Sequence, residues 1–359
     1  MTRYCLSLMT IMLNFEISVS KGYMATAVGL VFDREYYFDP LRRYETDRQC
    51  HEYVQHQLSD IEAFYTESNL GRLKYHDPKQ ALVGGIQPNM ILGMLLGAEF
   101  IANDKMDADI SPACRAGKSV DDLPEPESLL EHEVIQLFDR QIVELKKDAD
   151  KTPIPPFFWD ASGRAAIHGA MTTAQKFLGE SIFLDMISDP APVKRMADWV
   201  IETCIVLVRH FADLADIEIT CVHVGECSSC MVGPQHFSEM VVPGLNRVGE
   251  TLGPLRLHSC GQSNHILEVC KNTIPRLCSL DLGGETSLAK VRQLFGKDFP
   301  VSMAPVVTDL SSDSPDAVLH WLDETLKDND GGDLTIQYHI EPNYSLETLR
   351  AMCSKIKAA

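Results

Sequence analysis

The sequence lacks three features that mark common classes of protein: a long uninterrupted apolar segment, an excess of positive charge and a regular spacing of cysteines. No apolar run reaches the roughly 20 residues that a membrane-spanning helix requires. The 51 acidic residues outnumber the 32 basic ones and give a formal net charge of −19, which repels nucleic acid and anionic membrane surfaces. We therefore expect a protein that acts on small molecules or other proteins, with no nucleic-acid or membrane partner.

The eleven cysteines are odd in number and scattered, which does not match a disulfide framework. A chain of 359 residues with 45% apolar residues can bury a substantial core without covalent cross-links. Free thiols are typical of a reducing compartment, so we expect a cytoplasmic protein. The thiols are then available as metal ligands or as buried apolar filler.

The sequence also has no glycine-rich phosphate-binding turn after a predicted strand, which argues against an open doubly wound sheet. Its second half alternates strand-like apolar runs with helical segments, a pattern that predicts parallel strands covered by helices. Three further candidate strands lie upstream, and a total of about eight predicts a (β/α)8 TIM barrel. The predicted strands are 24–32, 81–86, a part of 157–168, 217–224, 255–258, 277–282, 300–307 and 334–340.

The barrel pattern also predicts the domain organisation. We expect residues 21–359 to form a single TIM-barrel catalytic domain. The segments 121–127 and 148–156 are predicted to be loops within it, because barrel-type units continue on both sides. Residues 1–20 contain the apolar stretch 5–13 and are expected to be a leader or a first helix.

Reactive side chains gather where the second-half strands are predicted to end, which in a TIM barrel is the face that carries the active site. Cysteine, histidine and carboxylate at one rim are what a zinc site with an open coordination position requires. The set comprises His223, Glu226, Cys227, Cys230, His258, Cys260, Asp281, Glu285, Tyr338, His339 and Glu341.

Within this set the sequence His258-Ser259-Cys260-Gly261 is the most informative. Residues two apart in a strand point to the same side, so His258 and Cys260 could bind one metal ion together. An imidazole beside a thiolate suits zinc. The alternative is a buried cysteine beside a hydrogen-bonded histidine.

Four other rim positions have open interpretations. Glu226 leaves a strand inside a turn, where a carboxylate is costly to bury unless it binds a metal or substrate, so it is a catalytic candidate together with Tyr338. Cys227 and Cys230 form a C-x-x-C pair, which is a redox dithiol, half of a structural zinc site, or two thiols in a loop.

Four segments, in order along the chain, carry a resemblance to a known family. They are 161–180 with its Phe177-Leu178-Gly179-Glu180 run, Gly233-Pro234-Gln235-His236-Phe237 followed by Pro243, the H-x-C-G sequence at His258, and 287–296. Together they resemble the uroporphyrinogen decarboxylase superfamily, and more closely its branch of cobalamin-linked, corrinoid-dependent methyltransferases.

The resemblance implies a barrel with its site at the C-terminal mouth, and it implies a set of zinc ligands. In these methyltransferases, zinc held by His, Cys and a second Cys binds a thiol and presents it to a methyl group on a corrinoid cobalt. His258 and Cys260 match the first two ligands. The final strand has Tyr338-His339-Ile340 at the third position, so His339 is the expected third ligand, with Glu226 or Cys227 as alternatives.

The expected function is therefore a zinc-dependent methyltransferase that moves a methyl group between a corrinoid protein and a small-molecule thiol or a methoxylated or methylated substrate. Glu226 would be a fourth ligand or would orient the substrate. The chain lacks the Asp-x-His-x-x-Gly signature of corrinoid proteins, so cobalamin would be carried by a separate corrinoid protein as partner. Two alternatives remain open: a uroporphyrinogen decarboxylase-like decarboxylase, although an arginine-rich N-terminal segment has no recognisable counterpart, and a non-catalytic tetrapyrrole-binding barrel.

Overall fold

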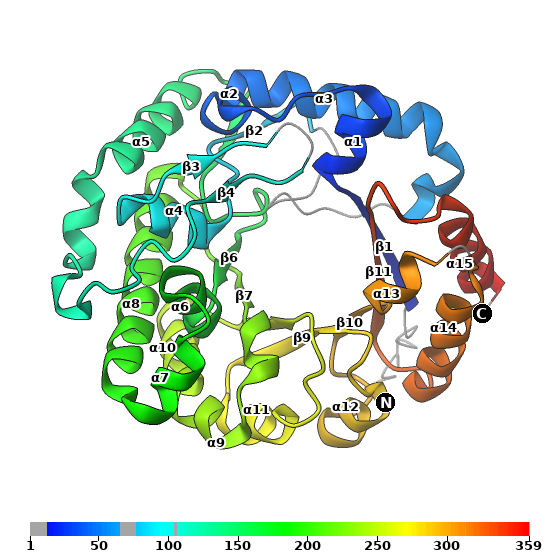
Figure 1. Ribbon diagram of the computed structural model, residues 1–359. Helices are drawn as coiled ribbons and strands as arrows, with labels where there is room; N and C mark the ends of the chain where they lie inside the picture. The colour runs from blue at the N-terminus through cyan, green and yellow to red at the C-terminus, as the bar shows by residue number, and fades with distance from the viewer. Residues whose placement is uncertain (1–12, 65–76, 104–105, 313, 359) are drawn as a thin grey trace, which may run out of the picture.

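A curled, all-parallel sheet forms the centre of the molecule, and helices surround it as a ring (Figure 1). The computed structural model describes residues 13–64, 77–103, 106–312 and 314–358. Seven strands are hydrogen-bonded in the order β1-β11-β10-β9-β8-β7-β6, which confirms the predicted TIM-barrel class. The strands are β1 (Leu13–Val19), β6 (Arg164–His168), β7 (Cys221–Gly225), β8 (Leu255–Ser259), β9 (Leu277–Gly283), β10 (Val301–Ala304) and β11 (Leu334–Ile340).

The ring is completed by strands that stand outside this sheet. The parallel pair β2 (Gln80–Leu82) and β5 (Thr152–Ile154) lies between β1 and β6 around the ring in Figure 1, and β3 (Phe100–Ile101) pairs antiparallel with β4 (Asp109–Ile110). In the described part of the chain, no ladder joins the β2–β5 pair to the seven-stranded sheet. The expected eight-stranded closure is thus seven strands in one sheet plus a separate pair.

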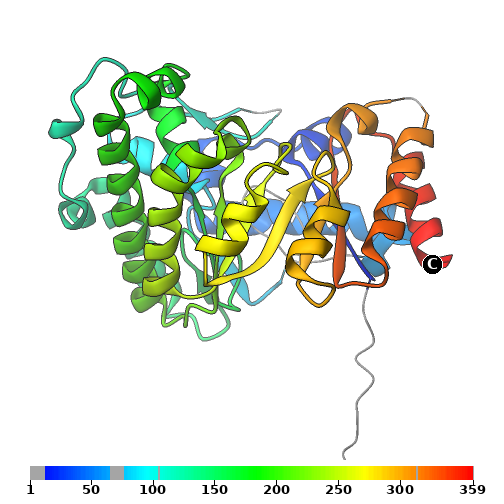
Figure 2. The ribbon, with the colours of Figure 1, turned by 90° about the horizontal axis from the view of Figure 1, so that it is seen from below.

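Helices cover the outer face of the sheet. In Figure 2 the green helices α8 and α10 and the orange-to-red helices α14 and α15 stand on opposite sides of the barrel. None of the described helices is long and apolar enough to cross a membrane. The longer helices are α3 (Pro40–Gln57), α5 (Glu133–Leu145), α8 (Pro190–Ala215), α10 (Val242–Leu252), α14 (Asp316–Asn329) and α15 (Leu346–Ala358).

Shorter helices and turns connect these elements. The short α-helices are α1 (Lys21–Val28), α2 (Arg34–Phe38), α4 (Pro88–Leu95), α6 (Ala170–Leu178), α7 (Ile182–Ser188), α9 (Pro234–His236), α11 (Leu267–Thr273), α12 (Leu288–Phe295) and α13 (Val307–Leu310). The 3₁₀ turns are η1 (Ser59–Phe64), η2 (Val120–Asp122), η3 (Pro126–Glu131) and η4 (Cys227–Met231), and η5 (Phe237–Val241) is a π-helical turn.

Apolar residues at helical spacing attach the longest helix, α8, to the core. They recur three and four positions apart, so they form one stripe that packs against the barrel while the opposite face stays in solvent. Pro190 stands in the first turn, where its missing N–H is not needed. The fully buried members of the stripe include Val193, Met196, Val200, Cys204, Leu207, Val208 and Phe211.

The N-terminal third differs from the sequence-based expectation in two places. Residues 1–20 were expected to be a leader or a helix, but Leu13–Val19 is strand β1, paired in parallel with β11, so the barrel includes residues before 21. Residues 1–12 lie outside the described part of the chain. The strand expected at 24–32 is wrong, because Ser20 caps a helix there by accepting a hydrogen bond from the Tyr23 N–H at 2.9 Å.

The other predicted elements are found with adjusted bounds. The five second-half strands are all present, although β7 and β10 are shorter than the apolar runs that predicted them. The segment 157–168 contains β6, and 81–86 overlaps the short β2. The segment 148–156, predicted to be a loop, contains β5, and 121–127 contains parts of η2 and η3.

Candidate active site

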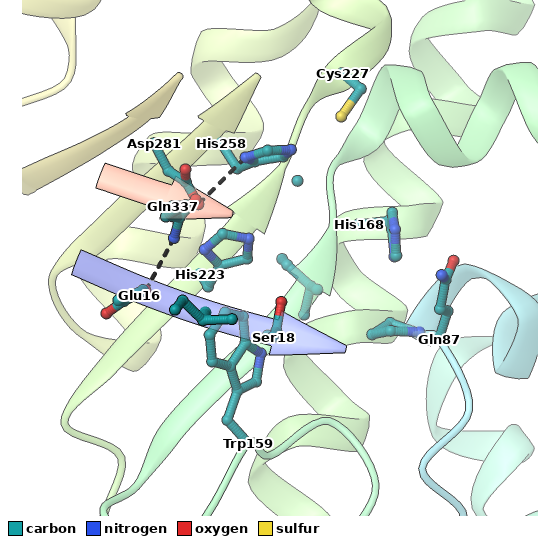
Figure 3. Close-up of a pocket in the computed structure, with 15 residues that line it drawn as sticks. Glu16, Ser18, Gln87, Trp159, His168, His223, Cys227, His258, Asp281 and Gln337 are labelled. Atoms are coloured by element: carbon teal, nitrogen blue, oxygen red, sulfur yellow. Dashed lines mark hydrogen bonds and ion pairs between the residues drawn. The ribbon is translucent and has the colours of Figure 1, made fainter. Parts of the chain in front are cut away.

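A cavity of about 240 Å³ lies inside the barrel, and polar side chains from both halves of the chain line it (Figure 3). Side chains alternate across a strand, so the positions that point inward from the sheet come together here. The polar and aromatic lining residues are Glu16 and Ser18 of β1, Gln87, Trp159, His168 of β6, His223 of β7, Cys227, His258 of β8, Asp281 of β9 and Gln337 of β11.

At the edge of this cavity, Cys227, His258 and Cys260 form a cluster that we call the Cys2His cluster. One ligand atom from each lies within 4.8 Å of the others. The strands explain the proximity: Gly225 of β7 is paired with His258 of β8, and the Glu226 N–H donates to the His258 carbonyl at 2.8 Å. The residues that follow β7 and β8, which include Cys227 and Cys260, therefore lie side by side.

The donor set of the cluster fits zinc. Two sulfurs and one imidazole nitrogen are among the ligands that zinc takes in proteins. Zinc–sulfur bonds of about 2.3 Å place two ligand sulfurs roughly 4 Å apart, so the observed separations need only a small adjustment. Three protein ligands leave the open position that a catalytic site requires.

Asp281 stands behind His258 and fixes its orientation. Its Oδ2 lies 3.3 Å from His258 Nδ1 and 3.0 Å from Nη2 of Arg256, and the other ring nitrogen of His258 points toward Cys227 in Figure 3. Burial alone would raise the pKa of Asp281, but Arg256 and His258 hold that pKa well below its usual range. Asp281 is therefore ionised. Because it interacts with Nδ1 of His258, the other ring nitrogen, Nε2, is directed at the thiols.

The pKa values of the three side chains in the Cys2His cluster are shifted in different directions. Burial alone would lower the pKa of His258, but Asp281 and Cys260 outweigh it and raise that pKa to about 9. Contacts with Cys227 and His258 lower the pKa of the Cys260 thiol, whereas the contact with Cys260 raises the pKa of Cys227. Cys260, which is exposed toward solvent, is therefore the thiolate of the pair.

Two more histidines and an indole make the cavity wall beyond the cluster. The ring centroid of His223 lies 5.6 Å from the ring centroid of His258 and 5.0 Å from that of Trp159. Burial lowers the pKa of His223 well below its ordinary value and that of His168 to about 4. Both imidazoles are neutral near pH 7, so this wall is uncharged and aromatic.

Glu226, a predicted catalytic residue, caps helix α6 and does not line the cavity. It is 1% exposed, and its carboxylate accepts hydrogen bonds from the N–H groups of Met171 and Thr172, each at 3.2 Å. Burial raises the pKa of Glu226 to about 7. Gly169 belongs to this arrangement, since a Cβ atom there would collide with the Glu226 carboxylate. Glu226 therefore fixes the start of α6 relative to the residue that follows it, Cys227, and so positions Cys227.

The two residues predicted on the final strand lie apart from the Cys2His cluster. Tyr338 does not line the cavity: it is 1% exposed, and its hydroxyl donates to the Ser345 carbonyl at 3.1 Å. His339 Nδ1 lies 2.7 Å from the Ser18 hydroxyl and Nε2 lies 3.2 Å from Glu341. Two candidate metal groups occur among the described residues, the Cys2His cluster and the set His223, His258 and Asp281, and His339 belongs to neither. The structure thus does not bring His339 together with His258 and Cys260.

Several lining residues were missed from the sequence. His168 ends β6, and Glu16 and Ser18 alternate with the buried Phe15 and Ile17 in β1. The alternation of polar and apolar residues in 13–19 is the signal that could have found this strand. Gln87 and Trp159 follow strands too short to give a pattern.

Three comparisons with known proteins add to this geometry. Residues 165–302 match the family described as Uroporphyrinogen decarboxylase (URO-D). No curated protein is significantly similar in sequence. Among solved structures, a methyltransferase from Methanosarcina mazei matches 98% of this chain and 95% of its own, with a TM-score of 0.64 and 13% identity. A putative vitamin-B12-independent methionine synthase from Listeria monocytogenes covers 99% and 97% at 9% identity, but its TM-score of 0.43 supports no argument.

The fold and the cavity define a parallel barrel with a cluster of sulfur and nitrogen donors at its C-terminal mouth. Residues 165–302 match the uroporphyrinogen decarboxylase family, in agreement with the resemblance seen in the motifs, and the fold of the chain is that of the Methanosarcina mazei methyltransferase. The matched segment runs from β6 to β10 and includes all three residues of the Cys2His cluster.

Proposed function

We propose that the protein is a zinc-dependent methyltransferase that moves a methyl group between a corrinoid protein and a small-molecule thiol or a methoxylated or methylated substrate. The observation that carries the proposal is the Cys2His cluster, in which the ligand atoms of Cys227, His258 and Cys260 lie within 4.8 Å of one another. Cys227 takes the ligand position that the sequence assigned first to His339.

Zinc bound by these residues would act as a Lewis acid that lowers the pKa of a coordinated thiol and so supplies a thiolate nucleophile near neutral pH. The residues of the chain prepare the site for this. Asp281 holds the imidazole of His258 in one orientation, and Arg256 keeps Asp281 ionised. The neutral His168, His223 and Trp159 provide a wall for the organic part of the substrate.

A second hollow of about 540 Å³ lies beside the inner cavity, and Gln87 borders both. It is lined by residues that follow β1, β3 and β11, such as Ser20, Asn103 and Glu341. These residues lie toward the carboxyl ends of the strands, where the mouth of a barrel opens. A corrinoid protein that carries cobalamin would bind over this mouth, with the partly exposed cluster beneath it.

The decarboxylase alternative has less support. Among the described residues that line the inner cavity, none is a lysine or arginine, whereas a substrate with many carboxylates needs cationic partners. Arg256, the nearest guanidinium, is engaged by Asp281 at 3.0 Å. The tetrapyrrole-binding alternative rested on the irregular residue at the third ligand position of the final strand. In the proposed site Cys227 is the third ligand, so that reason no longer applies.

Metal analysis of four proteins purified without oxygen tests the proposal: the wild type, Cys227→Ala, His339→Ala and the double variant His258→Ala/Cys260→Ala. We expect about one zinc per chain in the wild type and in His339→Ala, and a loss of zinc in the other two. Thermal unfolding confirms that each variant is folded. Transfer of the methyl group from methylcobalamin to 2-mercaptoethanol should follow zinc content.

Absence of zinc from a folded wild-type protein would overturn the proposal. Loss of zinc in His339→Ala with retention in Cys227→Ala would return the third ligand to the final strand. If the protein binds zinc but transfers no methyl group to or from any corrinoid, the proposed metal site would stand and the proposed methyltransferase activity would be refuted.

A further inference from the structure

A third thiol, Cys230, lies beside the Cys2His cluster and is not used by the proposed function. The sequence contains C-x-x-C at 227–230 and H-x-C at 258–260, which together offer three sulfurs and one nitrogen. Cys3His is one of the ligand sets of closed, four-coordinate zinc sites. The chain thus holds one more ligand than an open site needs.

Local geometry brings Cys230 to the same side as Cys227. Both residues belong to the 3₁₀ turn η4, which spans Cys227–Met231. A 3₁₀ helix has three residues per turn, so side chains at i and i+3 are nearly superimposed along its axis. The two thiols therefore project from one face of η4.

The glycine after Cys260 allows Cys230 to approach the cluster. A Cβ atom at Gly261 would lie 2.7 Å from Sγ and 2.8 Å from Cβ of Cys230, closer than real atoms approach. The Cys230 side chain therefore occupies the space next to residue 261, directly after the ligand Cys260. Any larger residue at 261 would push Cys230 away from the cluster.

The two halves of η4 are held differently. Its start is anchored to helix α6: the Ser228 N–H donates to the Thr172 hydroxyl at 3.1 Å, and the Ser228 hydroxyl donates to Gln175. Its end faces outward, since Met231 is 60% exposed and Cys230 is only partly buried. Cys227 is thus held by these contacts with the barrel. The backbone after Met231 is anchored again at the buried Val232, so any adjustment of Cys230 is confined to its partly exposed side chain, which can change rotamer.

We propose that Cys230 is a displaceable fourth ligand, which closes the zinc site in the resting protein and gives up its place to a thiol substrate. This inference rests on the proposed zinc site. In the exchange, the metal–sulfur bond to Cys230 breaks and a bond to the substrate sulfur forms. The proton of the substrate thiol passes to the released Cys230 thiolate, so charge balances and nothing is oxidised or reduced. The substrate class is accordingly a small free thiol.

The test counts sulfur ligands by X-ray absorption in zinc-loaded wild type, Cys230→Ala and the matched control Cys278→Ala, which removes an exposed thiol of β9. We expect Cys230→Ala to keep about one zinc per chain, to show one sulfur ligand fewer and to bind zinc roughly tenfold more weakly or worse. The control should match the wild type. Addition of 2-mercaptoethanol should leave the wild-type sulfur count unchanged and should restore the lost sulfur in Cys230→Ala.

A wild type and Cys230→Ala variant with equal sulfur counts and equal zinc affinities would overturn the inference and leave the proposed function intact. A rise in the wild-type sulfur count on addition of 2-mercaptoethanol would do the same, because it means that the fourth position was open. Absence of zinc from the wild type would overturn both.

Discussion

Asp281 is the single residue on which two positive groups at the site depend. Its carboxylate lies between the guanidinium of Arg256 and the ring of His258, and it is 5% exposed. Removal of one partner from a buried ionic group costs more than the pair itself contributes, because the remaining charge stays buried. Asp281 should therefore matter for stability as well as for the metal.

Asp281→Asn should lower the free energy of unfolding by about 3 kcal/mol and weaken zinc binding about 10- to 100-fold. Because the pKa of Asp281 is depressed in the fold, its stabilisation is present above about pH 4 and is lost at lower pH. Urea unfolding of the metal-free protein at several pH values measures the first effect, and zinc competition the second.

The control is Asp330→Asn, which breaks an exposed ion pair with Lys297 and should cost less than about 1 kcal/mol. Equal stabilities of the two variants at pH 7 would show that Arg256 finds another partner and would contradict the argument.

At this scale the sequence predicted part of the site. His258 and Cys260 were found because one short motif in a strand holds both, and Cys227 was kept as an alternative because it follows the neighbouring strand. The sequence does not show which alternate residue of a strand faces inward, and Tyr338 is not among the residues that line the cavity. His339 does face the barrel interior side of β11, beside Ser18, but on a strand far around the ring from β8.

At the scale of elements, the N-terminus of α6 and the turn η4 form one unit through Glu226. The Glu226 carboxylate accepts from the first N–H groups of α6, where the helix dipole favours a negative charge. The next residue is the ligand Cys227. The packing of Gly169 against Glu226 therefore sets where η4 begins and where the Cys227 thiol lies.

Gly169→Ala tests this unit. The added methyl group would displace the buried Glu226 carboxylate, so we expect a loss of about 1–3 kcal/mol in stability and weaker zinc binding. Gly233→Ala is the matched control: Gly233 also precedes a helix with a negative φ, and nothing lies within 4 Å of its Cβ position. Chemical unfolding and zinc competition measure both variants. Similar stabilities for the two would remove Glu226 from any positioning role.

Sequence periodicity predicted the second-half elements well because each strand is an apolar run between helical segments, some of which have a proline at their start. The N-terminal third was harder for a physical reason. The run 24–32 is apolar enough for a strand, but the Ser20 cap and tertiary packing make its first part a helix. Strand β1 has polar residues at every second position because one of its faces lines a cavity, so it lacks the continuous apolar character of the other strands.

At the scale of the whole molecule, the seven-stranded sheet has two edge strands, β1 and β6, which are not hydrogen-bonded to each other. Strand β8 lies between β7 and β9, whereas β1 pairs on one side with β11. Alternate amides of β1 therefore face away from a strand partner in the sheet. Local opening should start at this end.

Hydrogen exchange followed by mass spectrometry should show faster exchange in a peptide that covers β1 than in one that covers β8, under native conditions. The reason is that opening at β1 breaks one ladder and opening at β8 breaks two. Variation of denaturant concentration separates local from global opening. Equal protection of the two peptides would mean that the β2–β5 pair closes the barrel as firmly as a ladder does.

The three residues of the Cys2His cluster come from two adjacent strands: Cys227 lies just after β7, His258 lies in β8 and Cys260 directly follows β8. The side of the cavity formed by β1 and β11, with Ser18 and Gln337, contributes no member of either candidate metal group. Substitutions on that side can reshape the space for the substrate without disturbing the metal ligands. Under the proposed function, reactivity and substrate choice would thus be encoded in separate stretches of the chain, and each could change in evolution while the other is kept.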